Sequence, residues 1–264
     1  MKYLLTLSFL GTAYCGWQVQ KNAVSVQQAF QDAVYAAFGQ RGLVTGCSRT
    51  DAGVHARAFR CTLEAEPGKS FTVPPQSFPA AVSAFLPKDI SVLAAQEVPE
   101  DFHPRYSAVG KEYEYLIYPS FLRDPFLEGR AYRVSLSPDR IDHEKMDRAA
   151  AAITGKHDFA SFCASGSDAE DTVRTVYSCR VGTAEREDGG KLISIRVCGD
   201  GFLYNMVRII SGTLLDVGRG KLDEDAVGEI IEKRDRSAAG MTLPAEGLYL
   251  SRVIYDERQL HFPS

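Results

Sequence analysis

The chain has 264 residues, of which 45% are hydrophobic and 24% are charged. It is long enough to bury a large core, and its size lies between one large domain and two. The formal net charge of −4 excludes a protein that coats nucleic acid through a uniformly positive surface, so any RNA binding must rely on local basic residues. No stretch approaches the ~20 apolar residues that a membrane-spanning helix needs, so no membrane partner is expected.

The cysteines lack the close spacing of a metal site or a redox pair. They stand at positions 15, 47, 61, 163, 179 and 198, and no two of them form a C-x-x-C pair. We therefore expect reduced thiols in a cytoplasmic protein, and no metal. His55, His103, His143 and His157 also lack metal-ligand spacing and are expected to be structural or capping residues.

The first ten residues resemble a short signal peptide, with one basic residue before an apolar run. However, Leu5, Leu7 and Phe9 alternate with Thr6 and Ser8. Strict alternation is the pattern of a half-buried strand, which is the interpretation we favour.

The next segments predict a small α+β layer. Residues 11–18 form a loop with the only tryptophan, Trp17, which is either a core residue or a platform for base stacking. Ser25 and Gln28 then form a capping box. A helix follows, which ends at a glycine, and its apolar residues recur every fourth position: Val26, Phe30, Val34 and Phe38, with Gly39 or Gly42 as the stop. A strand over 58–63, a helix with an apolar face and a strand over 90–93 complete the layer; that face holds Phe78, Val82, Phe85 and Leu86.

The pattern breaks at residues 102–108, which predicts a boundary between an N-terminal domain over 1–107 and a C-terminal domain over 108–264. The second half again mixes strands and helices. The expected strands cover 111–118, 173–181, 192–197 and 247–254, and the expected helices begin at Asp142 and cover 204–217 and 224–233. Gly218 is expected to end the helix over 204–217, and residues 187–190 to form a hairpin turn.

One stretch, residues 46–59, carries a candidate for chemistry. It places Asp51 among Arg49, Arg57 and Arg60. Neighbouring cations keep a carboxylate ionised, which suits a nucleophile or an electrostatic partner better than a general acid. The same Thr-Asp-Ala-Gly segment is also typical of an ordinary turn, in which Asp bonds its own backbone and Gly supplies a positive φ. Local chemistry leaves both interpretations open.

The nine residues Ser48–Ala56 resemble the signature of the tRNA pseudouridine synthase A (TruA) family. Other segments resemble blocks of this family in the same order: 16–18, 25–27, 111–115, 157–162, 174–176, 202–208 and 246–250. Two positions depart from the family pattern. Leu10 stands where Asp is usual, and Pro104 stands where Ala is common. Both lie in expected loops, so they bear on local RNA contacts and not on the reaction.

This resemblance implies a fold, an activity and partners. The fold is the α+β pseudouridine synthase type, with two ferredoxin-like or RRM-like halves whose antiparallel sheets join side by side around a central cleft. The activity is isomerisation of uridine to pseudouridine at positions 38–40 in the anticodon stem-loop of tRNA, with no cofactor. The resemblance also implies a homodimer in which one tRNA contacts both subunits.

The resemblance further assigns roles to individual residues. Asp51 is the nucleophile, Tyr113 lies beside the target base and Arg208 is the ion-pair partner of Asp51. Leu248 forms the apolar wall of the pocket, and Arg49 fills the vacated stack or grips a phosphate. Whether Asp51 attacks C6 of the uracil or C1′ of the ribose stays open. Six further basic residues are candidate phosphate contacts or simply scattered surface charges: Arg41, Arg57, Arg60, Lys111, Arg219 and Lys221.

Two other classes of function are considered. A non-catalytic RNA-binding module could stack bases on Tyr113, Tyr115 and Trp17. A hydrolase with a carboxylate nucleophile would need a second acid ~5–9 Å from Asp51. The nearest acids in sequence are Glu64 and Glu66, and nothing marks either as catalytic. The hydrolase ranks last.

Overall fold

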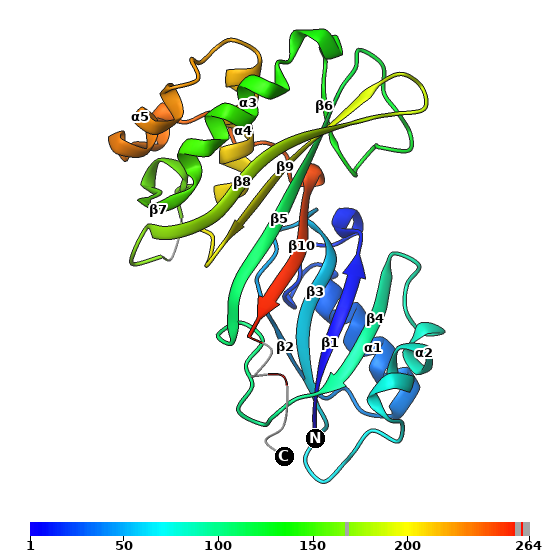
Figure 1. Cartoon of the computed structure of the whole chain (residues 1–264). Helices are drawn as coiled ribbons and strands as arrows, with labels where there is room; N and C mark the ends of the chain where they lie inside the picture. Colours follow the sequence, from blue (N-terminus) through cyan, green and yellow to red (C-terminus); the bar gives the residue numbers. More distant parts are fainter. Residues whose placement is uncertain (167–168, 257–259, 261–264) are drawn as a thin grey trace. The chain divides into compact units, whose positions relative to one another are not determined.

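The computed structural model describes residues 1–166, 169–256 and 260, and it contains ten β-strands and five α-helices in that part of the chain (Figure 1). The chain divides into two compact units. Unit 1 comprises Met1–Val109 and the segment that begins at Tyr249, and unit 2 comprises Gly110–Leu248. The sequence analysis assigned everything after residue 107 to a second domain. The final strand belongs instead to unit 1, because its backbone pairs there with a strand that begins at His55.

The sheet of unit 1 is built around β1 (Lys2–Phe9), which is antiparallel to β3 (His55–Glu64) and to β4 (Ile90–Glu97). β2 (Leu43–Gly46) and β10 (Leu248–Tyr255) both pair with β3, at its opposite ends. The order β4–β1–β3–β2, with a helix before β2 and another before β4, is the ferredoxin-like arrangement.

The first strand is more buried than its alternating pattern predicts. Residues Tyr3–Leu7 are all buried, because β1 is a central strand with apolar groups on both of its faces. On one face Leu4 packs with Val98 and Phe102, and on the other Tyr3 contacts the ring of Phe78. The prediction of a strand at the start of the chain is confirmed. The prediction that only one face of this strand is buried was wrong.

Two helices lie on one face of this sheet (Figure 1). In α1 (Val26–Phe38), Ser25 Oγ accepts a hydrogen bond from the Gln28 N–H at 3.1 Å, and Gly39 ends the helix with φ 66°. The Gln28 side chain donates to Asp32 and does not accept from the Ser25 N–H, so only half of the capping box forms. The second helix, α2 (Phe78–Ser83), ends too early to bury Phe85, whose side chain is 50% exposed.

Unit 2 contains an antiparallel sheet in the order β5–β9–β8–β7. Its strands are β5 (Ala108–Pro119), β7 (Gly155–Asp158), β8 (Val173–Glu185) and β9 (Lys191–Gly199). The short strand β6 (Tyr132–Val134) is parallel to the end of β5. The expected strands of this half are confirmed, and the hairpin turn at residues 187–190 joins β8 to β9.

The helices of unit 2 are α3 (His143–Ala150), α4 (Met206–Gly218) and α5 (Ala226–Lys233). Asp142 caps α3 by accepting a hydrogen bond from the Lys145 N–H at 2.8 Å, as expected. Gly218 is the last residue of α4, and a Cβ there would lie 2.6 Å from the sulfur of Met146. Gly218 therefore permits close packing of α3 against α4, rather than acting only as a helix stop.

Short 3₁₀ turns connect several elements and lie at Gly11–Ala13, Pro75–Ser77, Pro138–Arg140, Ala151–Ile153, Ala160–Phe162, Arg236–Ala238 and Ala245–Gly247. None of the helices within residues 1–166, 169–256 and 260 has both the length and the apolar character of a bilayer-spanning segment.

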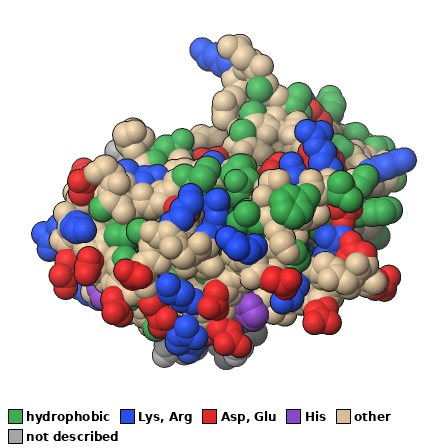
Figure 2. Space-filling model, turned by 90° about the horizontal axis from the view of Figure 1, so that it is seen from above, with side chains coloured by type: hydrophobic (Ala, Val, Ile, Leu, Met, Phe, Trp, Pro, Cys, Tyr) green, Lys and Arg blue, Asp and Glu red, His purple; other side chains and the backbone are tan. Residues whose placement is uncertain are grey.

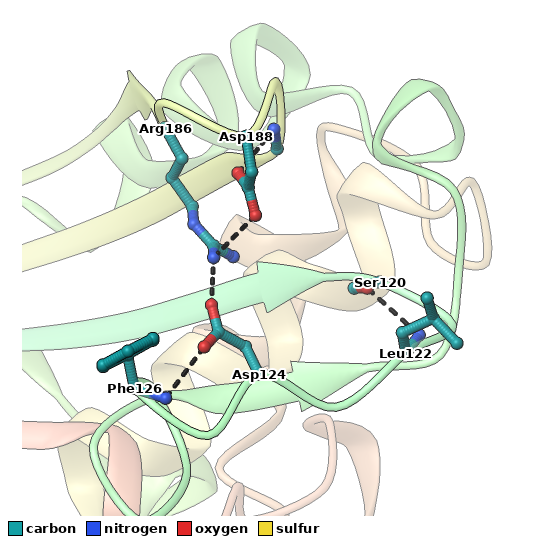
Figure 3. A network of polar contacts seen from close by, with 7 residues as sticks. Ser120, Leu122, Asp124, Phe126, Arg186 and Asp188 are labelled. Carbon is teal, nitrogen blue, oxygen red and sulfur yellow. Dashed lines mark hydrogen bonds and ion pairs between the residues drawn. The ribbon is translucent and has the colours of Figure 1, made fainter.

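The loop that follows β5 is fixed to the turn between β8 and β9 by a polar network (Figure 3). Arg186 forms ion pairs with Asp124 and with Asp188, and Asp124 Oδ1 accepts from the Phe126 N–H at 2.8 Å. Ser120 Oγ accepts from the Leu122 N–H at 3.1 Å. Three large apolar side chains of this loop are nevertheless exposed: Phe121 at 68%, Leu122 at 78% and Phe126 at 83%.

Candidate active site

Asp51 lies in the connection between β2 and β3, in unit 1. A turn runs from Asp51 to Val54, closed by a 3.2 Å hydrogen bond from the Val54 N–H to the Asp51 carbonyl, and Gly53 has φ 80°. The expected turn is therefore present. The Asp51 side chain is partly exposed. A turn conformation and a chemical role are compatible, because the turn organises the backbone and leaves the carboxylate accessible.

A second loop, residues 11–17, holds the Asp51 turn in place. The Trp17 N–H donates to the Thr50 carbonyl at 3.2 Å, and the Gly53 N–H donates to the Tyr14 carbonyl at 3.3 Å. A Cβ at Gly11 would collide with the Val54 carbonyl, and a Cβ at Gly16, where φ is 103°, would collide with the Thr50 carbonyl. Two glycines thus allow the loops to touch, which ties the Gly-Trp-Gln segment to the Asp51 segment physically.

Trp17 is a core residue. Its side chain is buried, and its ring stacks on that of Phe59 with centroids 4.0 Å apart. Gly46 leaves the space that the indole fills, since a Cβ there would collide with the indole nitrogen. Trp17 therefore cannot serve as a base-stacking platform, and the RNA-binding alternative loses one of its three aromatic residues.

His55, which follows the Asp51 turn, has the structural role that the sequence analysis expects. It is completely buried, and its Nδ1 accepts a hydrogen bond from the Gly11 N–H at 2.9 Å. Its ring lies 4.6 Å from that of Tyr249, the second residue of β10. His55 thus connects the loop that supports Asp51 to two strands of the sheet.

The arginines around Asp51 have different environments. Arg49 is exposed. Arg57 is also exposed, and its Cζ lies 4.6 Å from the centroid of the Tyr249 ring. Arg60 is partly buried, and its Nε has no hydrogen-bond partner within the part of the chain that the structure describes. Arg41 pairs with Asp32 at 2.6 Å on the surface, which favours the surface-charge interpretation for that residue.

Unit 2 holds the aromatic candidates on β5. Tyr113 is 8% exposed, and its ring meets that of Phe202 edge to face at 5.2 Å. Tyr115 is completely buried, and its hydroxyl donates to the Pro244 carbonyl at 2.6 Å. Burial raises the pKa of the Tyr115 hydroxyl. Tyr115 is therefore a packing residue and cannot stack on a base, which further weakens the RNA-binding alternative.

Arg208 is held in a defined orientation near the start of α4. Its Nε donates to the Leu243 carbonyl at 2.7 Å, and its Nη1 donates to Asn205 Oδ1 at 2.6 Å. Asn205 immediately precedes α4 and has a left-handed backbone with φ 60°. Sequence reasoning missed Asn205, although its position three residues before an arginine at a helix start was an available signal.

Leu248, the expected apolar wall of the pocket, is buried at the start of β10.

The remaining basic candidates lie in unit 2. Lys111 is partly buried on β5, opposite Gly199 of β9. Arg219 and Lys221 both pair with Asp216, at 3.8 Å and 3.2 Å, which favours a local ion cluster over phosphate binding. On the face shown in Figure 2, Lys and Arg side chains are interspersed with Asp and Glu side chains.

The acids proposed for a hydrolase are engaged elsewhere. Glu64 pairs with Lys2 at 3.1 Å, and Glu66 pairs with Lys69 at 2.7 Å. The hydrogen bond from Lys69 lowers the pKa of the Glu66 carboxyl, which makes it a poor general acid. Within the described residues, no three His, Cys, Asp or Glu side chains are grouped so that they could hold a metal ion.

Comparison with known proteins identifies the family. A family model described as "tRNA pseudouridine synthase" matches residues 6–107 and 149–256. The chain belongs to the tRNA pseudouridine synthase family. This result confirms the resemblance drawn from the motifs, the isomerase class of the enzyme and the α+β pseudouridine synthase fold. Asp51, Arg208 and Leu248 fall within the matched segments, whereas Tyr113 and Lys111 fall between them.

Individual relatives are similar over nearly the whole chain. "tRNA pseudouridine synthase A" of Acetivibrio thermocellus is 45% identical over 251 residues, which is 95% of this chain and 98% of the relative. The protein of the same name from Ruminiclostridium cellulolyticum is 44% identical over 257 residues, covering 96% and 99%. A chain in the "Crystal Structure of a Cbf5-Nop10-Gar1 Complex" matches with a TM-score of 0.34 and 10% identity, over 94% of this chain and 48% of that chain. A structural similarity at that level supports no inference about this chain.

Proposed function

We propose that this protein isomerises uridine to pseudouridine at positions 38–40 of the anticodon stem-loop of tRNA, without a cofactor. The observation that carries the proposal is the Ser48–Ala56 motif, whose Asp51 turn is clamped by the glycine-containing loop 11–17. The names of the relatives point to the same substrate class. No net oxidation or phosphoryl transfer occurs in this reaction, so the chemistry itself requires no cofactor.

The reaction needs a nucleophile and a means of holding a detached base. The bond between N1 of uracil and C1′ of the ribose breaks, the base rotates, and a bond forms between C5 and C1′. The proton that C5 loses is balanced by the proton that N1 gains. Asp51 is the proposed nucleophile, and attack at C6 or at C1′ would satisfy this balance.

The other proposed roles follow from side-chain chemistry. Arg208 supplies the counter-charge of the Asp51 carboxylate, since an opposite charge nearby favours the ionised form that a nucleophile needs. Tyr113 packs beside the uracil, and its hydroxyl moves the proton from carbon. Leu248 provides the apolar wall of the pocket. Arg49 occupies the space left by the extruded base or grips a phosphate, because its guanidinium is planar and permanently charged.

The target base must leave the stem before it can react, and unstacking and unpairing it costs a few kcal/mol. Basic residues that contact phosphates would offset this, and we propose Arg57 and Lys111 among them. Given the net charge of −4, two copies of the chain would present more basic surface to one tRNA than a single copy, which supports a homodimer.

The cysteines bear on the location of the protein. None of the six cysteines, all in the described part of the chain, forms a disulfide, which supports a cytoplasmic location.

The test is release of tritium from tRNA labelled at C5 of uridine. Wild-type protein should release tritium from tRNA that carries uridine at positions 38–40, and Asp51→Asn should reduce release below detection, since the loss of a catalytic nucleophile reduces turnover by several orders of magnitude. Asp32→Asn is a matched control, because Asp32 is an exposed acid paired with Arg41. Full turnover by Asp51→Asn would remove Asp51 as the nucleophile.

The same assay separates the enzyme from a non-catalytic RNA-binding protein. Binding of tRNA with no tritium release by wild type would favour the binding module. Tyr113→Phe adds a second distinction, since it keeps the ring and removes the hydroxyl. We expect it to retain tRNA affinity and to lose turnover.

A further inference from the structure

Unit 1 contains a cavity of about 230 Å³ at the edge of its sheet where β1 ends and β3, β4 and β10 begin. Arg57 and Tyr249 line one side of the cavity, and Lys88 and Asp89 line another. Its volume is below the roughly 300–1,000 Å³ of pockets that take drug-sized molecules. The cavity therefore suits one small group, such as a single phosphate, better than a complete nucleotide.

The charged side chains of the cavity favour an anion. Arg57 and Lys88 are both exposed cations, and Lys88 has no ion-pair partner among the described residues. Asp89 is the only acid in the lining, and its Oδ1 accepts a hydrogen bond from the Tyr14 hydroxyl at 2.7 Å. Two positive charges thus face one carboxylate that already has a donor.

The geometry of the cavity also suits phosphate oxygens. The guanidinium of Arg57 lies over the Tyr249 ring, and such stacking orients its N–H groups while leaving its edge accessible. Ser8 and Ser91 are directly paired across β1 and β4, and both line the cavity. The Ser8 hydroxyl donates to the Ala56 carbonyl at 3.3 Å, so Ser91 is the hydroxyl that can donate to an anion. A held guanidinium, an ammonium and one hydroxyl make a set of donors that matches a phosphate group.

The cavity is connected to the Asp51 turn through the loop 11–17. Tyr14 contacts both, because its carbonyl accepts from the Gly53 N–H at 3.3 Å while its hydroxyl bonds Asp89 in the cavity wall. Leu10 lines the cavity, and the next residue, Gly11, packs against the carbonyl of Val54. An anion in the cavity would therefore lie close to the loop that supports Asp51.

We infer that this cavity binds one backbone phosphate of the tRNA, with Arg57 and Lys88 gripping the same phosphate group. This inference rests on the proposed function, since it names where the substrate of that reaction is held. It adds Lys88, Ser91 and Tyr249 to the residues that position the substrate, and it gives Arg57 a defined contact. None of these residues takes part in bond making or breaking.

The experiment measures the affinity of an unmodified tRNA transcript over a series of salt concentrations, for Arg57→Gln, Lys88→Gln and the double variant. Each single variant should bind roughly tenfold more weakly, the loss expected for a charge-assisted hydrogen bond. The slope of log affinity against log salt should fall by roughly one. Because both cations hold the same phosphate, the double variant should lose about as much slope as either single variant.

Two matched controls come from the same unit. Arg105 is an exposed arginine stacked on Tyr106, with its Cζ 5.8 Å from the ring centroid, and it does not line the cavity. Lys69 is an exposed lysine paired with Glu66. Arg105→Gln and Lys69→Gln should leave both affinity and salt slope unchanged. Arg57→Lys keeps the charge and should retain the slope, which separates charge from any loss of folding.

The outcomes are distinguishable from failure of the proposed function. A wild type that releases no tritium from labelled tRNA removes the proposed function itself. If wild type is active but Arg57→Gln or Lys88→Gln behaves like its control, the cavity does not bind tRNA. Additive slope losses in the double variant would mean two separate phosphates and would overturn the shared grip. If inorganic phosphate binds the cavity while the variants keep the tRNA affinity of wild type, the cavity is a site for free phosphate instead.

Discussion

The backbone N–H of Gly11 donates to Nδ1 of the buried His55 at 2.9 Å. Since Nδ1 is the acceptor, the neutral ring carries its proton on Nε2. This bond joins the loop that clamps the Asp51 turn to the first residue of β3. Its loss should affect both the stability of unit 1 and the position of the Asp51 turn.

We expect His55→Ala to lower the free energy of unfolding by about 2–4 kcal/mol, because it creates a cavity and leaves the Gly11 N–H without its acceptor. His55→Asn should restore part of this loss, since an amide oxygen can take the place of Nδ1. Urea denaturation of the three proteins measures the difference. Equal destabilisation by Ala and Asn would show that the hydrogen bond contributes little.

A second prediction concerns Asn205, whose Oδ1 accepts from Arg208 Nη1 at 2.6 Å. Asn205→Gly suits the left-handed backbone, so it should fold with nearly wild-type stability while releasing one side of the guanidinium. We expect kcat to fall roughly tenfold, for ~1.4 kcal/mol of lost positioning, with little change in KM. Asn205→Asp keeps an acceptor and should recover activity. A variant Asn205→Gly with unchanged kcat would mean that the other contacts of Arg208, among them the Leu243 carbonyl, orient it without Asn205.

The ion pair between Arg186 and Asp124 should protect the loop after β5 from proteolysis (Figure 3). Arg186→Gln should increase chymotrypsin cleavage at Phe121, Leu122 and Phe126 by roughly fivefold, corresponding to ~1 kcal/mol less support for the closed loop. Arg148→Gln removes an exposed pair with Glu224 and should not change the cleavage rate. Mass spectrometry of the fragments would locate the cuts. Identical digestion of both variants would contradict a role for Arg186 in fixing this loop.

Thiol reactivity should follow burial. Burial raises the pKa of Cys179 to about 12 and also raises that of Cys61. Because the thiolate is the reactive form, both should resist iodoacetamide in the native protein at about pH 8, whereas Cys15 and Cys163 are partly exposed and should react. Peptide mapping after a short labelling pulse tests this. Rapid native labelling of Cys61 would contradict its burial, and labelling of all six thiols in urea is the control.

Acidification should destabilise unit 1 through His103. Burial lowers the pKa of His103, and the nearby charges of Lys2 and Arg105 lower it further. The unfolded chain takes up a proton near pH 6.5, whereas the folded chain does so only at lower pH. Stability should therefore fall as pH decreases from about 6.5. His103→Asn, whose oxygen can still accept from the Arg105 N–H, should show a smaller fall in urea midpoint between pH 7.5 and 5.5. The same fall in both proteins would assign the effect to other groups.

Several features of the fold are determined by residues that lie close together in the sequence. The start of α1 at Ser25, its end at Gly39 and the Asp142 cap of α3 are local, because capping bonds and the left-handed glycine conformation involve neighbouring residues. The strand over 111–118 follows from its alternating aromatic residues. The motif around Asp51 identifies the family because it is long and specific, although local chemistry alone favoured an ordinary turn.

Other features depend on residues far apart in the chain, and only the tertiary structure decides them. Pairing of Tyr249 with His55 places the last strand in unit 1, and close packing against Met146 explains Gly218. The same holds for the burial of Trp17 against Phe59, the carbonyl of Leu243 that orients Arg208, and the cavity between Arg57 and Lys88. Sequence periodicity reports which face of an element is apolar. It does not report which distant backbone or side chain that element meets, because this depends on how the whole chain packs.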